Sequence, residues 1–166
     1  MNKIILFFIV VVVFLVGAFA WQNKEVFSPT KDLINNTILP NSKSLNLSNQ
    51  GLTKIPSSVF NQTGLEELNV SNNNLTGAIQ SQIGQLKNLK VLNASNNSMT
   101  GVPAEVGQLQ KLEVLDLSNN QLTGLPNELG NLKNLKTLNI SGNQYSEQDL
   151  NYIKSKLPLT TNIITK

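Results

Sequence analysis

The chain has 166 residues, enough for one domain, and its 13 basic and 10 acidic residues leave a formal net charge of only +3. All the basic residues are lysines, and cysteine and histidine are absent as well. Because proteins recognise phosphates and base edges largely through the planar guanidinium of arginine, this composition argues against nucleic-acid binding. Thiols and imidazoles are the usual nucleophiles, bases and zinc ligands, so we expect no enzyme activity, no metal and no cofactor.

A long apolar run, from Ile4 to Ala20, follows the single charge of Lys3. Ala18-Phe19-Ala20 fits the cleavage site of a signal peptide, but the run exceeds the roughly 7 to 15 apolar residues that such peptides carry. It reaches the lower bound for spanning about 30 Å of hydrocarbon, with Trp21 placed at the outer interface. Residues 1–21 are therefore predicted to be a signal-anchor transmembrane helix, or a signal peptide cleaved after Ala20. Either way the rest of the chain is expected outside the cytoplasm, membrane-anchored in the first case and secreted in the second.

Residues 22–41 are predicted to form an N-terminal cap or linker, in which Ser28-Pro29 can begin a short helix. From residue 42 onwards one phrase recurs every 23 or 24 residues. Self-similarity at a period of about 20 to 29 residues predicts a solenoid whose every turn is one strand plus a return arm. The copies are SKSLNLSNQGL from Ser42, LEELNVSNNNL from Leu65, LKVLNASNNSM from Leu89, LEVLDLSNNQL from Leu112 and LKTLNISGNQY from Leu135.

The sequence pattern LxxLxLxxNxL resembles that of the leucine-rich repeat family, in its bacterial or plant-type form. The resemblance covers roughly residues 42–145, as five repeats, of which the first is degenerate. It implies an α/β solenoid, a right-handed superhelix with a short parallel β-sheet on its concave face. We number the eleven positions of the phrase 1 to 11. Positions 4 and 6 alternate with polar neighbours, which predicts a strand with one buried face. The position-4 leucines should stack as a core column of Leu45, Leu68, Leu92, Leu115 and Leu138.

Position 9 is asparagine in four copies. Its side chain can bond backbone groups that are left unpaired where the chain turns out of the strand. The neighbouring Asn96, at position 8, is expected to be dispensable. We predict a structural Asn ladder of Asn73, Asn97, Asn120 and Asn143.

The return arms share a proline, at Pro56, Pro103 and Pro126. The second repeat has Gln80 at this position and is one residue longer, which predicts a local bulge. After the last repeat, Ser146 precedes an acid by three residues and is followed by apolar residues at helical spacing. Residues 146–166 are therefore predicted to be a C-terminal cap, with a capping helix ended by Pro158 and a last short strand at 163–164.

The concave face is predicted to carry two uniform rows of exposed side chains, asparagine at position 5 and serine at position 7. A surface of identical side chains cannot discriminate between ligands. The residues of this face that differ from asparagine and serine are therefore the ligand-binding candidates, Glu67, Val91, Val114 and Asp116. The alternative is a solvated face with no partner. Position 2 alternates in sign between turns and is predicted to form exposed ion pairs rather than a site, at Lys43, Glu66, Lys90, Glu113 and Lys136.

These patterns predict a non-enzymatic binding or scaffold module displayed outside the cytoplasmic membrane. It would contact the membrane through its N-terminal segment and bind a protein or glycan partner through its concave face. The alternative is an ice- or surface-binding solenoid that uses regular Thr, Ser and Asn columns. Its main candidate column is Thr53, Thr76, Thr100 and Thr123.

Overall fold

The computed structural model describes residues 42–166. The predicted membrane segment or signal peptide (1–21) and the N-terminal cap (22–41) lie outside the described residues. Within residues 42–166, no helix has the length and apolar character needed to cross a membrane.

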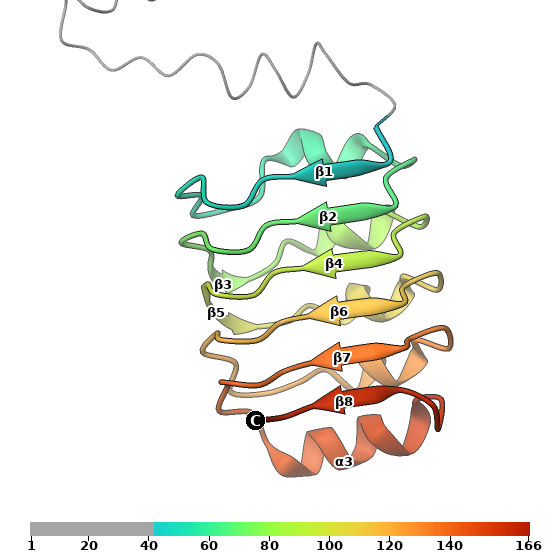
Figure 1. The fold of residues 1–166 in the computed structure, drawn as a ribbon. Coiled ribbons are helices and arrows are strands. Elements are labelled where there is room, and N and C mark those ends of the chain that lie inside the picture. Colours follow the sequence, from blue (N-terminus) through green and yellow to red (C-terminus); the bar gives the residue numbers. More distant parts are fainter. Residues whose placement is uncertain (1–41) are drawn as a thin grey trace, which may run out of the picture. The chain divides into compact units, whose positions relative to one another are not determined.

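Six short parallel strands form one sheet, in which each strand comes from a successive turn of the chain (Figure 1). The position-4 leucines are direct register partners from Leu45 to Leu138, as the core column requires. The alternation of apolar and polar residues thus turns one face of every strand toward the core. The strands are, in sheet order, β1 (Ser44–Asn46), β2 (Glu67–Asn69), β4 (Val91–Asn93), β6 (Val114–Asp116), β7 (Thr137–Asn139) and β8 (Asn162–Ile164).

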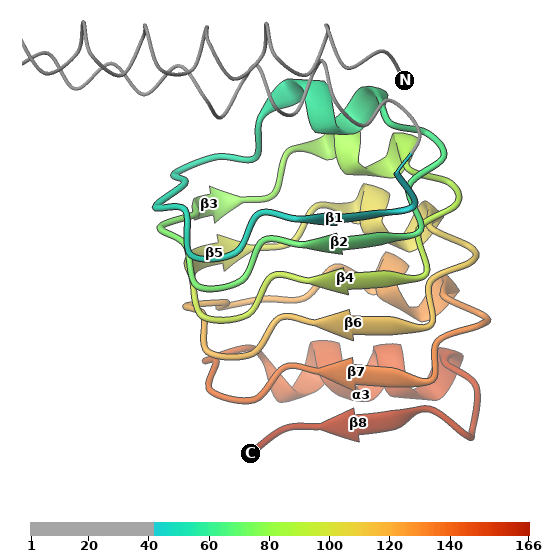
Figure 2. The same cartoon turned by 45° about the horizontal axis from the view of Figure 1, so that its top comes forward.

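The return arms lie on the other side of the core and contain short 3-10 helices (Figure 2). Three of these helices begin directly after the recurring proline, whose fixed φ suits this entry, and η2 begins after Gln80. The helices are η1 (Ser57–Asn61), η2 (Ser81–Gln85), η3 (Ala104–Gln108) and η4 (Asn127–Asn131).

A second, two-stranded sheet joins β3 (Thr76–Ala78) to β5 (Ser98–Gly101) in the return arms. Its register shifts between Gly77 and Ala78. The pairing of the second repeat is irregular, as predicted, but the extra residue is Thr100 on β5, in the third repeat.

A single apolar cluster runs through the stack, and the position-1 leucines Leu65, Leu89 and Leu112 are completely buried in it. The return arms pack closely because glycine recurs where each 3-10 helix meets the next helix, at Gly84 against η3, Gly107 against η4 and Gly130 against α3. A Cβ atom on Gly107 would overlap the carbonyl oxygen of Glu128 and lie 2.6 Å from the carbon of that group.

After the last repeat the chain forms α3 (Glu147–Lys156) and then β8. The Ser146 hydroxyl accepts the N–H groups of Gln148 and Asp149, at 3.2 and 3.4 Å, which satisfies two free donors at the helix start. Leu150 and Ile153 are buried against the stack.

Candidate binding surface

The four candidate ligand-binding residues lie together on three adjacent strands. Glu67, Val91 and Val114 are consecutive register partners across β2, β4 and β6. Asp116 follows Val114 by two residues on β6, so its side chain points to the same face. Glu67 is exposed, and the other three are partly exposed. We call these four residues the central cluster, and the face on which they lie, opposite the core, the open sheet face.

The position-7 serines do not form the predicted exposed row. Ser71, Ser95 and Ser118 are only 5%, 6% and 5% exposed. The strands end at position 5, so the chain is already turning at position 7 and the alternation of faces no longer applies. The open sheet face is therefore narrower than the sequence pattern suggested.

The position-5 side chains are partly committed to this turn. Asp116 accepts the N–H of Ser118 at 2.9 Å and its hydroxyl at 2.6 Å, both through Oδ1. Asn93 does the same for Ser95, at 3.0 and 2.8 Å. This contact explains why position 5 is nearly always asparagine, because the side-chain carbonyl oxygen of asparagine accepts these turn hydrogen bonds as well as a carboxylate oxygen does. What distinguishes Asp116 is therefore its negative charge.

The position-9 asparagines bond to backbone groups of two successive turns. Asn120 Nδ2 donates to the carbonyls of Leu117 and Ala94, both at 3.0 Å, and to that of Ser118 at 3.2 Å. Its Oδ1 accepts the N–H of Met99 at 3.0 Å. Asn73, Asn97 and Asn143 repeat this arrangement.

Position 8 carries a constraint that sequence reasoning missed. Asn96 has a positive φ of 54°, and its Oδ1 accepts a hydrogen bond from Asn119 at 2.9 Å. Asparagine and glycine tolerate this left-handed conformation, whereas alanine is strained in it. The expectation that Asn96 is dispensable is therefore wrong for an alanine substitution. Gly142, at position 8 of the last repeat with a φ of 68°, was the available signal.

Ion pairs line the start of the strands, as the alternating signs predicted. Glu66 lies between two lysines, 2.7 Å from Lys43 Nζ and 2.6 Å from Lys90 Nζ. These two hydrogen-bonded ammonium groups lower the pKa of Glu66 from 4.5 to about 2. A further pair joins Glu113 to Lys136 at 2.6 Å, and this contact also lowers the pKa of Glu113.

A titration tests whether these ion pairs form in solution. Because the folded-state pKa of Glu66 is depressed, its pairs stabilise the protein above pH 4.5, and that stabilisation is lost as the pH falls through about 2. We expect the Glu66 carboxyl signal to titrate by NMR with a midpoint near 2. Lys43→Gln and Lys90→Gln should each raise the midpoint, whereas Lys87→Gln, at an exposed lysine elsewhere, should leave it unchanged. A midpoint near 4.5 in the unsubstituted protein would show that the pairs do not form in solution.

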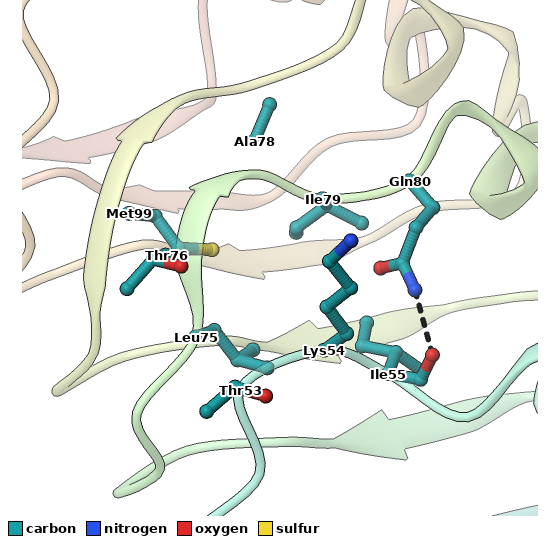
Figure 3. Close-up of a pocket in the computed structure, with 9 residues that line it drawn as sticks. All are labelled: Thr53, Lys54, Ile55, Leu75, Thr76, Ala78, Ile79, Gln80 and Met99. Atoms are coloured by element: carbon teal, nitrogen blue, oxygen red, sulfur yellow. Dashed lines mark hydrogen bonds between the residues drawn. The ribbon is translucent and has the colours of Figure 1, made fainter.

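One pocket lies in the return arms, between the first and second repeats (Figure 3). Lys54 and Thr76 line it with Met99, and Gln80 Nε2 closes one side by donating to the Ile55 carbonyl at 2.6 Å. The cavity volume is about 10 Å³, too small for any ligand larger than one water molecule.

The threonines proposed for ice or surface binding are all exposed, but they do not form a regular column. Thr76 is the register partner of Ser98, and Thr100 has no partner on β3 because the register shifts between Gly77 and Ala78. The spacing between hydroxyl groups is therefore interrupted after the second threonine.

This arrangement, a stack of short parallel strands, 3-10 return arms and asparagine-bonded turns, defines a repeat solenoid with an open sheet face. The family model for the leucine-rich repeat region matches residues 31–157, and the chain belongs to the leucine-rich repeat family. Proteins of this family are generally non-enzymatic binding modules. Comparison with curated protein sequences found no match.

Solved structures support the same assignment. A leucine-rich repeat protein of Leptospira interrogans is 40% identical with a TM-score of 0.68, over 73% of this chain and 30% of that one. The ectodomain of the receptor kinase SOBIR1 from Arabidopsis thaliana is 32% identical with a TM-score of 0.59, over 73% of this chain and 68% of that one. The plant peptide hormone receptor RGFR1, in complex with RGF2, is 34% identical with a TM-score of 0.60, over 74% of this chain and 20% of that one. This chain thus spans less than a third of the Leptospira protein and of RGFR1.

Proposed function

We propose that this protein is a non-enzymatic binding or scaffold module, displayed outside the cytoplasmic membrane, that binds a protein or glycan partner through its open sheet face, the predicted concave face. The observation that carries the proposal is the central cluster. Val91 and Val114 form an apolar pair on a face whose other strand positions are mostly polar. Exposed Glu67 is the register partner of Val91, and the charged Asp116 follows Val114 by two residues on β6.

The chemistry of the central cluster suits such a partner. The two valines can cover an apolar side chain or the apolar face of a sugar ring. The Glu67 carboxylate, whose contact in the sheet is the Ser44 hydroxyl at 3.1 Å, can accept hydrogen bonds from ligand N–H or O–H groups. Binding by a similar plant receptor also supports the proposal, since the peptide hormone receptor RGFR1 is in complex with RGF2 in its solved structure.

Two conservative substitutions test the surface without disturbing the turn. Asp116→Asn keeps the acceptor for Ser118 and removes the charge, and Val114→Thr keeps the shape and replaces one apolar methyl group with a hydroxyl group. We expect each to weaken binding several-fold, because truncations of contacts that matter at interfaces usually cost more than about 1 kcal/mol. The melting temperature should stay nearly unchanged.

The measurement is capture of cell-surface proteins and glycans on the full-length chain and on these variants. Gln85→Ala, an exposed position on η2 across the core, is the control. A partner that is retained by all the variants alike would exclude the open sheet face as its binding site.

The N-terminal segment makes a separate prediction. We expect residues 1–21 to be retained as an anchor, because the apolar run is long for a signal peptide and ends at Trp21. Mass spectrometry of the mature protein in membrane fractions should therefore find the N-terminal residues. A mature chain that begins at Trp21 in the soluble fraction would replace anchoring by secretion.

Ice binding is the less well supported function, because the register shift at Gly77 and Ala78 interrupts the threonines. A regular hydroxyl array would need equal spacing between turns. Thermal hysteresis of the purified protein would reverse this ranking.

A further inference from the structure

At the C-terminal end of the stack, one strand edge has no partner among residues 42–166. β8 is the last strand of the sheet and pairs only with β7 in the described part of the chain (Figure 1). The N–H of Asn162 donates to Lys136 at 2.8 Å, and the carbonyl of Ile164 accepts from Ile140 at 2.9 Å. Because backbone groups alternate in direction along a strand, the N–H and carbonyl of Ile163 face away from the sheet. Such an edge is a template for another strand.

The same end exposes apolar surface. Leu159 is 104% exposed and Tyr152 is 47% exposed, and they are the only large apolar side chains classed as exposed in residues 42–166. Tyr152 lies on α3, and Leu159 lies in the turn that joins α3 to β8. Both therefore lie in the segment from α3 to β8 that closes this end of the stack.

The charges on α3 favour a second copy of this chain as the partner. Glu147 in its first turn and Lys154 in its last turn are exposed, whereas Asp149 accepts the N–H of Leu125 and Lys156 packs beside Gly130, so these two face the stack. A second α3 that runs antiparallel to the first would place Glu147 of each copy opposite Lys154 of the other. A parallel arrangement would place like charges together, so the surface is complementary to itself only under a two-fold rotation.

We propose that two copies of this chain associate end to end through β8 and α3. A two-fold axis perpendicular to the sheet passes midway between the Ile163 residues of the two copies, whose outward N–H and carbonyl groups exchange both hydrogen bonds with each other. The sheet then continues across the dimer as an antiparallel pair of β8 strands. The two α3 helices run antiparallel on the return-arm side, and Tyr152 and Leu159 become covered. The open sheet faces of both copies remain free and point to the same side.

The register of this pairing makes a specific prediction. Centring it on Ile163 places Asn162 of one copy directly opposite Ile164 of the other, in a pair that is not hydrogen bonded. The Cα atoms of such pairs lie about 4.5 Å apart, within the range that a disulfide can span. Both side chains point to the open sheet face, as their register partners Thr137 and Asn139 do.

The experiment uses the absence of native cysteine. Full-length Asn162→Cys and Ile164→Cys proteins, carrying tags of different size, are mixed in mild detergent and oxidised. We expect the mixed 162–164 disulfide to exceed the 162–162 and 164–164 products several-fold. Gln121→Cys, at an exposed position away from this end, should give no preferred product with either variant. The cysteines report on the C-terminal end alone, so association through residues 1–21 does not produce this pattern.

A second measurement tests the charge argument. In the absence of oxidant, sedimentation of the unsubstituted protein should give twice the mass of one chain. Lys154→Glu should weaken this association several-fold, and Lys54→Glu, at an exposed lysine near the other end of the stack, should not. A monomeric mass overturns the proposal. So does a dimer whose cross-links are statistical or whose stability is indifferent to Lys154.

Discussion

Gly107→Ala is expected to destabilise the protein by about 3 kcal/mol, near the upper end of what overpacking a rigid site costs. The added Cβ would overlap the carbonyl oxygen of Glu128, a backbone atom that cannot move without displacing η4. Because each repeat contacts only its neighbours, the substitution should weaken the joint between the third and fourth repeats. Urea unfolding followed by circular dichroism measures the loss.

Two other glycines provide a graded control for this experiment. A Cβ on Gly84 would lie 3.0 Å from the Cβ of Glu105, so Gly84→Ala should cost less than Gly107→Ala. A Cβ on Gly64 meets nothing within 4 Å, so Gly64→Ala should be nearly silent. Equal unfolding midpoints for the three variants would contradict the close packing of the return arms.

Asn120→Ala is expected to cost at least about 1 to 3 kcal/mol, because buried backbone groups lose their hydrogen-bonding partner. Asn120 is 8% exposed and bonds three carbonyls and one N–H. The same reasoning gives Asn97→Ala a cost of similar size, since Asn97 makes the equivalent contacts.

The control for the Asn ladder is an exposed neighbour with an ordinary backbone conformation. Gln121→Ala meets this need, whereas Asn96→Ala does not because of its positive φ. Thermal melts of Asn120→Ala and Gln121→Ala should differ clearly. If they coincide, the position-9 side chains are not a structural ladder.

The sheet could be predicted from the sequence because a two-residue alternation, repeated in five copies, leaves only one way to stack the strands. Leu68 and Leu92 occupy the same position of the phrase, and they are register partners in the sheet. The burial of Ser95 and the positive φ of Asn96 could not be read in this way. Both residues follow the end of the three-residue strand, where the turn decides which way each side chain points.

The central cluster could be predicted as well, since it consists of strand positions that depart from the repeat phrase. What the sequence could not supply was the separate role of each atom in it. The hydrogen bond from Ser118 to Asp116 makes the carboxylate part of the turn as well as part of the surface. Only the three-dimensional contact shows that asparagine, rather than alanine, is the informative replacement.

Site-specific photocrosslinking tests most directly whether the open sheet face binds the partner. A photoreactive amino acid replaces Thr137, the register partner of Val114, so that the central cluster itself stays intact. A second protein carries the same group at Gln85, on η2 across the core. We predict that the captured partner crosslinks to position 137 and not to position 85. Crosslinking at position 85 alone would place the binding surface on the return arms and contradict the proposed function.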